Sequence, residues 1–294
     1  MAIDTATDVF EEHRPVLMGV AYRMLGRVAD AEDVVQEAWL RWTDADRSEV
    51  RTPRAYLVRI TTRLAIDRLR RVQTRHETYV GPWLPEPYVT DFGDTVPDTA
   101  ERAVLADSVS LAVLVVLESL SPLERAVFVL REAFGFPYAE IATTLDRSES
   151  AVRQLAGRAR RHVEERRPRY EVDPAERRAL TERFLAAAVE GDLEGLMNLL
   201  APEVRLVGDS GGLSKAPVRV IESADKVGRF LYGVARQGVP DATFRAVELN
   251  GGAAFLVLSG DKVDTAFQLD VVDGRIRCVY IMRNPEKLLS LSPH

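Results

Sequence analysis

Two groups of polar and basic residues in this 294-residue chain are spaced to bind nucleic acid. On a helical wheel of residues 53–71, three arginines share one side, opposite the apolar residues: Arg59, Arg63 and Arg70. Residues 138–160 predict a helix-turn-helix with Ser148 as the N-cap of its second helix. The outward residues of that helix are Ser148, Glu149, Ser150, Arg153, Gln154, Arg158 and Arg161. Early side chains of such a helix reach base edges and later arginines reach phosphates, so both groups point to DNA.

The distribution of charge supports this interpretation although the net charge is −6. Residues 51–77 hold eight arginines and two acids, and residues 147–169 hold eight arginines and three acids. Between them, residues 81–124 hold eight acids and one arginine. Salt screens charges beyond about 10 Å, so DNA responds to each basic stretch separately. Arginine suits this role because its planar fork pairs with phosphates and base edges.

The composition predicts neither a metal site nor a membrane protein. Four histidines and one cysteine, Cys278, cannot supply a Cys/His metal cluster, and a single cysteine excludes an internal disulfide. No stretch approaches eighteen consecutive apolar residues, and the N-terminus lacks the hydrophobic run of a signal peptide. We therefore expect a cytoplasmic protein that carries no cofactor.

Enzymatic chemistry has few candidate residues in the last third of the chain. Its one histidine, His294, stands at the end, which leaves carboxylates such as Asp209, Asp261 and Asp270 for proton transfer. Asp261 lies in a predicted turn, and Asp270 lies among polar positions that alternate with apolar ones along a predicted strand. We expect that the chain is not an enzyme.

Helices must position the two basic groups. Apolar spacing predicts helices over residues 9–25, 30–42 and 53–71, the last with Thr52 as N-cap and Pro53 at its first position. A linker rich in proline, glycine and acid follows. Two further helices, over residues 101–118 and from Pro122 onward, precede the helix-turn-helix. The predicted domains are residues 1–75, a linker at 76–100, residues 101–169 and residues 173–294.

The composition changes after Asp173, where strands join the helices. Helices are predicted from Pro174 to the glycine at 191, in a short segment up to residue 200, and over residues 223–237. The predicted strands are residues 204–207, 243–249, 253–258, 263–272 and 275–282. Turn dipeptides separate the last four, which predicts tight hairpins in a curved antiparallel sheet and an α+β domain.

Residues 22–42 (YRMLGRVADAEDVVQEAWLRW) and 52–71 resemble region 2 of the extracytoplasmic-function sigma factors, and residues 120–163 resemble their region 4. The resemblance implies two all-α sigma domains, a three-helix bundle and a helix-turn-helix, that recognise the −10 and −35 promoter elements. It implies contact with the RNA polymerase core, at the β′ clamp and the β flap. The implied core-binding residues are Glu32, Asp33, Gln36 and Glu37. The implied −10 residues are Arg59, Thr62, Arg63 and Arg70, and the outward residues of the second helix would read the −35 element.

The third section resembles the SnoaL-like, NTF2-like cone fold, and three short motifs resemble those of the sigma-J-like subgroup with such a fused domain. These motifs are WLPEP at 83–87, DSGG at 209–212 and NPEKL at 284–288. The resemblance implies a built-in regulator in place of a separate anti-sigma protein. The implied interdomain residues are Trp83, Pro85, Asp209, Gly211, Asn284, Pro285 and Lys287.

Other interpretations stay open at this point. The chain could be a ligand-sensing helix-turn-helix regulator, or a SnoaL-type cyclase or isomerase with a DNA-binding region. A repressor, however, has no use for a segment such as residues 30–71. The linker could also pack on its own helices, which would leave the last domain a passive appendage.

Overall fold

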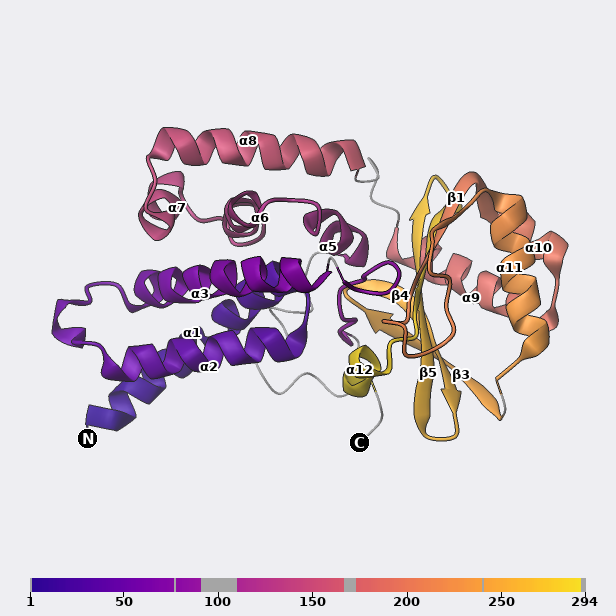
Figure 1. Cartoon of the computed structure of the whole chain (residues 1–294), viewed down its shortest axis with the longest axis horizontal. Coiled ribbons are helices and arrows are strands. Elements are labelled where there is room, and N and C mark those ends of the chain that lie inside the picture. The colour runs from indigo at the N-terminus through magenta and orange to yellow at the C-terminus, as the bar shows by residue number, and fades with distance from the viewer. Residues whose placement is uncertain (1, 77, 91–109, 167–172, 240, 292–294) are drawn as a thin grey trace. The chain divides into compact units, whose positions relative to one another are not determined.

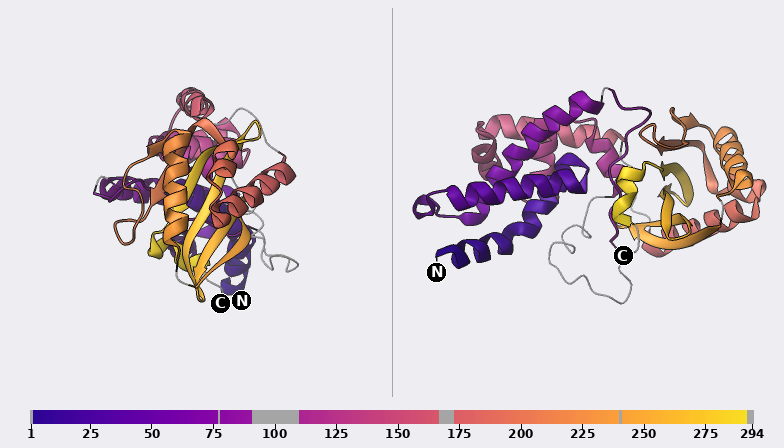
Figure 2. Two further views of the ribbon diagram at one scale, coloured as in Figure 1. Left: turned by 90° about the vertical axis from the view of Figure 1, so that its right-hand side faces the viewer. Right: turned by 60° about the horizontal axis from the view of Figure 1, so that its bottom comes forward.

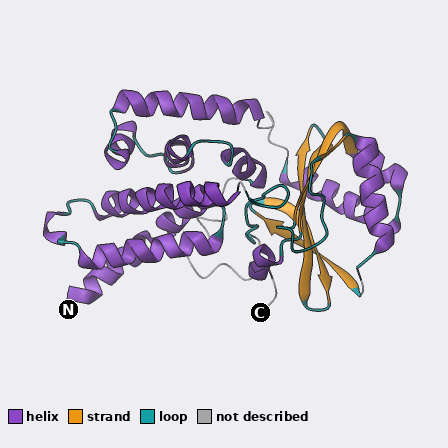
Figure 3. Cartoon of the chain, viewed as in Figure 1, coloured by secondary structure: helices purple, strands orange, loops and turns teal. Residues whose placement is uncertain are grey.

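The computed structural model describes residues 2–76, 78–90, 110–166, 173–239 and 241–291. Backbone contacts divide the chain into two compact units, one of residues 1–77 with 92–167 and one of residues 78–91 with 168–294 (Figure 1). Among the described residues, the first unit is helical and the second holds the strands (Figure 3). The segment at 78–90, which is part of the predicted linker at 76–100, belongs to the second unit.

Three helices open the first unit, as predicted. They are α1 (Ala2–Leu25), α2 (Val28–Asp44) and α3 (Pro53–His76), with a 3-10 turn, η1 (Arg47–Glu49), before α3. Gly26 ends α1 with φ of +70° and donates its N–H to the Tyr22 carbonyl at 2.7 Å. Both α1 and α2 pack against α3, which places the apolar side of the predicted −10 helix in a core.

The helical wheel of α3 is only partly confirmed. The residues on the apolar side of the wheel are buried except Ile60, which is half-buried: Leu57, Val58, Ile60, Leu64, Ala65, Leu69 and Val72. Ile66, which falls on the arginine side of the wheel, is also buried. The helical wheel assumes that only one side of the helix is buried. In the structure α3 packs against α1 and α2 and also contacts α6 and α7, two helices described in the next paragraph. Arg68, predicted in the apolar arc, lies with its Nη2 atom 2.5 Å from Asp30 Oδ1, and this hydrogen bond is the main cause that raises the pKa of Arg68.

The second helical section of this unit contains the predicted helix-turn-helix. Its elements are α5 (Leu111–Leu117), α6 (Pro122–Phe128), the π-type turn η2 (Val129–Ala133), α7 (Tyr138–Leu145) and α8 (Glu149–Arg166). Ser121 and Glu124 form a capping box at α6. Asp146 takes the left-handed conformation between α7 and α8, with φ of 54°, and Ser148 Oγ caps α8 by accepting the Ala151 N–H at 3.2 Å. The predicted helix at 101–118 lies partly outside the described residues.

In the second unit, three helices cover one face of a six-stranded sheet (Figures 1 and 2). The helices are α9 (Pro174–Glu190), α10 (Leu193–Leu199) and α11 (Ala224–Gln237). The strands are β1 (Leu200–Asp209), β2 (Ile221–Glu222), β3 (Ala242–Leu249), β4 (Gly252–Ser259), β5 (Lys262–Val272) and β6 (Arg275–Met282), in the order β2-β1-β6-β5-β4-β3. A short helix, α12 (Pro285–Leu288), and a 3-10 turn, η3 (Leu289–Leu291), follow.

The prediction of an all-antiparallel sheet is wrong at one pair. The hairpins β3–β4, β4–β5 and β5–β6 are antiparallel as predicted, but β1 and β6 are parallel. The space between helices and sheet is filled by apolar side chains, among them Phe184, Phe255 and Phe267. The rings of Phe255 and Phe267 stack at 4.6 Å. The interior that would hold a ligand in an open cone is therefore a packed core.

One buried arginine ties the two helical sections of the first unit together. Arg125 in α6 is 1% exposed, and its Nε atom donates to the Arg23 carbonyl at the end of α1 at 2.9 Å. Its Nη1 atom lies 2.6 Å from Glu118 Oε1. A buried guanidinium needs such partners, because an unpaired buried charge strongly destabilises a fold.

We expect Arg125→Ala to lower the free energy of unfolding by about 3 kcal/mol, because the Arg23 carbonyl and the Glu118 carboxylate lose this donor inside the protein. Urea unfolding of the full chain, followed by circular dichroism, measures this loss. Arg41→Ala is the control, because Arg41 forms an exposed pair with Glu37 and should cost less than about 0.5 kcal/mol. Equal losses in the two variants would contradict the role of Arg125.

Candidate nucleic-acid interface and linker lock

The predicted −35 residues lie together on the exposed side of α8. All seven are exposed: Ser148, Glu149, Ser150, Arg153, Gln154, Arg158 and Arg161. The guanidinium of Arg153 lies 2.5 Å from Glu149 Oε1, and Arg158 Nε lies 3.1 Å from Glu124 Oε1. The Ser121 hydroxyl, and more weakly Arg158, lower the pKa of Glu124. The helix thus presents short polar groups at its start and paired arginines further along.

The predicted −10 residues do not all share one surface. Arg70 is exposed beside Asp67, and Arg59 is half-buried with its guanidinium 5.3 Å from the centre of the Tyr56 ring. Thr62 is 0% exposed, and its hydroxyl has no hydrogen-bond partner. Thr62 therefore does not lie on the surface with the arginines, because it sits about 100° around the helix from Arg63. Sequence reasoning placed Thr62 at the interface from the motif alone, and the structure corrects that placement.

Within the first unit, the start of α3 and the helix-turn-helix line one cleft of about 650 Å³. Its walls include Tyr56 and Arg59 from α3 and Glu140 and Thr143 from α7. Arg63 Nε donates to the Thr144 carbonyl at 2.8 Å across this region. Arg63, a predicted −10 residue, is therefore hydrogen-bonded to the backbone of α7, the first helix of the helix-turn-helix.

The four predicted core-binding residues, Glu32, Asp33, Gln36 and Glu37, are all exposed on α2. Asp33 pairs with Arg68, and Glu37 pairs with Arg41. Leu40 follows on the same side of the helix and is 56% exposed. Sequence reasoning missed this exposed apolar residue, although its spacing of three and four residues from Glu37 and Gln36 could have indicated it.

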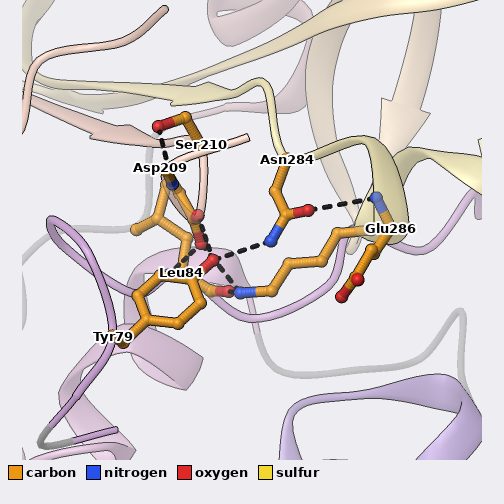
Figure 4. Close-up of polar contacts among 8 residues, drawn as sticks. Tyr79, Leu84, Asp209, Ser210, Asn284 and Glu286 are labelled. Atoms are coloured by element: carbon orange, nitrogen blue, oxygen red, sulfur yellow. Dashed lines mark hydrogen bonds and ion pairs between the residues drawn. The ribbon is translucent and has the colours of Figure 1, made fainter. Parts of the chain in front are cut away.

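The second unit buries a polar cluster that joins the linker to the C-terminal domain (Figure 4). We name it the linker lock: Tyr79, Leu84, Asp209, Asn284 and Lys287. The Lys287 ammonium lies 2.7 Å from Asp209 Oδ2 and donates to the Leu84 carbonyl at 2.5 Å. The Leu84 N–H donates to the same carboxylate oxygen at 2.8 Å, and the Tyr79 hydroxyl donates to Oδ1 at 2.5 Å. Asp209 and Lys287 side chains are 0% and 2% exposed.

The three subgroup motifs meet at this lock. The Lys287 ammonium lies 4.0 Å from the centre of the Trp83 ring, and Pro85 is buried. Asn284 donates to the Tyr79 hydroxyl at 2.7 Å and caps α12 by accepting the Glu286 N–H at 3.0 Å, with Pro285 at the first helical position. The sequence placed Trp83, Asp209, Asn284 and Lys287 in one contact. It missed Tyr79, which lies outside the three motifs, and it missed that Leu84, inside WLPEP, takes part through its backbone N–H and carbonyl.

Gly211 is required at the lock by space as well as by conformation. Its φ is +58°, and a Cβ atom there would lie 2.7 Å from Asn284 Nδ2 and 3.0 Å from the Tyr79 hydroxyl. Further along the linker, Thr90 N–H donates to the Glu248 carbonyl at 2.9 Å, and Asn250 N–H donates to the Tyr88 carbonyl at 2.8 Å. Residues 79–90 are therefore held at both ends.

The candidate carboxylates for catalysis do not converge. Asp209 is committed to the lock, and Asp261 is exposed at a turn. Asp270 stands between Leu269 and Val271, whose side chains belong to the apolar core, so Asp270 lies on the opposite face of the sheet. In the part of the chain that the structure describes, no three His, Cys, Asp or Glu side chains gather as a metal site requires. No described helix combines the length and apolarity needed to cross a membrane.

The comparisons with known proteins agree with the two helical sections. Residues 9–75 match the family described as Sigma-70 region 2, and residues 110–163 match Sigma-70, region 4. The chain is 42% identical to the ECF RNA polymerase sigma factor SigJ of Mycobacterium tuberculosis, over 95% of this chain and 91% of that protein. This chain belongs to the extracytoplasmic-function sigma factor family. It directs promoter-dependent transcription initiation by RNA polymerase.

The resemblance extends through the fused domain. The crystal structure of M. tuberculosis SigJ matches with a TM-score of 0.79 and 38% identity, over 98% of this chain and 99% of that one. The probable sigma factor SigI of the same organism is 34% identical over 97% of this chain and 95% of its own length. The C-terminal α+β domain is thus part of the shared architecture.

The environment of Asp270 predicts a pH dependence of stability in this sigma factor. Burial raises the pKa of Asp270 from 3.8 to about 6, while Arg277 and Arg177 oppose that rise. Because the folded pKa lies above the unfolded one, the carboxylate begins to destabilise the fold as pH rises above about 4, and the cost is complete above about 6.

We expect Asp270→Asn to stabilise the full chain by about 1–3 kcal/mol at pH 8, with the gain shrinking as pH falls from 6 to 4.5. Unfolding by urea at several pH values measures this difference. Asp261→Asn, at the exposed turn, is the control and should leave the pH profile of the wild type unchanged. A gain from Asp270→Asn that is constant with pH would contradict the assigned ionisation.

Proposed function

We propose that the fused C-terminal domain is the built-in regulator of this sigma factor, and that it acts by holding the linker between the two DNA-reading regions. The observation that carries this proposal is the linker lock. A buried ammonium, a buried carboxylate and the backbone of Leu84 satisfy one another, so the linker is needed to complete the lock. A domain with no role beyond its own fold would not need to bury the Lys287 ammonium against the linker, because burial of a charge costs free energy.

The position of the lock in the chain supports a regulatory role. Helix α3, with the predicted −10 arginines, ends at His76, and the lock begins at Tyr79. Three residues span at most about 11 Å when fully extended, so the docked linker gives α3 a short tether. If the lock is released, residues 79–90 also become free, so the flexible segment that follows α3 becomes longer.

The proposed division of labour follows the exposed surfaces. Helix α8 reads the −35 element through the seven exposed residues named above, and Arg59, Arg63 and Arg70 bind the −10 region. Glu32, Asp33, Gln36 and Glu37 bind the β′ clamp, with Leu40 as an apolar anchor at their side. The helix-turn-helix module binds the β flap. We propose that the chain does this work in the cytoplasm.

We infer that the resting chain keeps its −10 surface occupied. The hydrogen bond from Arg63 to the Thr144 carbonyl is the contact that favours this inference. DNA must displace this bond to reach Arg63. Under this proposal the fused domain takes the place of a separate anti-sigma protein, and it has no catalytic role, since its interior is filled and its carboxylates are dispersed.

Lys287→Met tests the proposal. The substitution removes the ammonium, leaves the Leu84 carbonyl without this donor and buries the Asp209 charge unpaired, so the linker should undock. Faster hydrogen exchange at the Leu84 and Thr90 amides would report undocking. We expect run-off transcription by the reconstituted holoenzyme to rise at least threefold, because the restraint on the DNA-reading regions is lost.

Lys262→Met, at an exposed position of the same domain, is the matched control and should change neither measurement. Unchanged transcription from a chain whose linker is demonstrably released would end the regulator proposal. A fall in transcription would mean that the docked linker supports the active form.

A further inference from the structure

The −35 module contains an aromatic residue packed against two guanidinium groups. Tyr138, the first residue of α7, has Arg131 4.7 Å and Arg153 4.5 Å from the centre of its ring. Arg131 is itself anchored, because its Nη1 atom donates to the Phe136 carbonyl at 3.0 Å. The ring therefore rests against a fixed cation and offers its π system to Arg153.

The contact with the Tyr138 ring restricts the side chain of Arg153, a residue of α8. It lies in the second turn of the reading helix, where side chains reach base edges, and it is 60% exposed. Glu149, one turn earlier, holds the guanidinium from a second direction at 2.5 Å. An exposed arginine otherwise samples many rotamers, and it loses that freedom when it forms a forked bond to a base.

We propose that Tyr138 is a positioning residue for promoter recognition, which fixes the Arg153 guanidinium in its reading orientation before DNA binds. The inference rests on the proposed −35 role of α8 and goes beyond it, because Tyr138 lies on α7 and carries no motif of DNA contact. The ring acts through Arg153: it reduces the freedom that Arg153 must lose and favours one direction of its planar fork.

The main partners of two other arginines of α8 are glutamates. Arg158 pairs with Glu124 of α6, and Arg160 pairs with Glu132 at 2.7 Å and interacts more weakly with the Tyr138 side chain. Those contacts place charge near phosphates, where the direction of the donors matters less. Loss of the Tyr138 ring should therefore weaken the preference for one base of the −35 element, and leave the other positions intact.

The test uses the full chain in holoenzyme with RNA polymerase core and a duplex DNA library randomised across the −35 element. Arg153→Ala should lower the preference for one base, at one position of the −35 element, by at least tenfold. Tyr138→Leu, which keeps an apolar side chain but no ring, should weaken the preference at that same position by about three- to tenfold. Tyr138→Phe keeps the ring and should stay within twofold of the wild type. In the Arg153→Ala background, Tyr138→Leu should add less than twofold.

Several results would overturn the inference. Tyr138→Leu could leave the Arg153 position unchanged, could weaken all positions equally, or could act equally with and without Arg153. Tyr138→Met keeps the inference testable if Tyr138→Leu disturbs folding, since the flexible methionine side chain fills space without a ring, and it should weaken the same base position by about three- to tenfold. If Arg153→Ala changes the base preference at no position of the −35 element, Arg153 does not read a base. That result contradicts the proposed −35 role of Arg153, and with it the role of Tyr138.

Discussion

The second unit depends on the need to satisfy one buried ammonium. Lys287 comes from α12, and its partners come from the end of β1 and from the linker, so three segments far apart in sequence must meet before the charge is paired. Each segment has a second reason to be there. The same Asp209 carboxylate accepts from the Leu84 N–H and the Tyr79 hydroxyl, and Asn284 both caps α12 and donates to Tyr79. Removal of one partner leaves the others with unpaired buried atoms, which is why the linker, the glycine turn and α12 behave as one structure.

The first unit follows a related rule at its surface, where the arginines proposed to bind DNA already have partners in the protein. Arg153 and Arg158 pair with glutamates, Arg70 pairs with Asp67, and Arg63 donates to a backbone carbonyl. Under that proposal, DNA binding is an exchange in which phosphates and base edges replace carboxylates and carbonyls. Exposed pairs of this kind are weak, so they yield readily to a polyanion, yet they order the side chains beforehand. This explains how a chain with a net charge of −6 can hold two arginine-rich surfaces.

Local signals in the sequence predicted most elements, and the misses have a common cause. The N-cap at Ser148 and the helix starts at Pro122 and Pro174 depend on neighbouring residues, and the structure confirms them. The parallel pairing of β1 with β6 depends on strands about seventy residues apart, which no local period encodes. Ile66 falls on the arginine side of the wheel yet is buried, because a wheel of α3 carries no information about α6 and α7, and Thr62 was misplaced because it was assigned from a motif alone. The contact of the WLPEP segment with Asp209, Asn284 and Lys287 was expected from motifs, whereas Tyr79 and the Leu84 backbone bear no pattern that a sequence can show.

Thermodynamic linkage limits how strong the linker lock can be if it controls promoter use. Any free energy by which docking disfavours DNA or core polymerase is also the free energy by which those partners disfavour docking, because coupling is reciprocal. Couplings between sites are typically about 1–3 kcal/mol, while removal of one side of a buried ion pair costs about 3–5 kcal/mol. Binding of the polymerase alone therefore shifts the lock only in part, unless the lock is offset elsewhere.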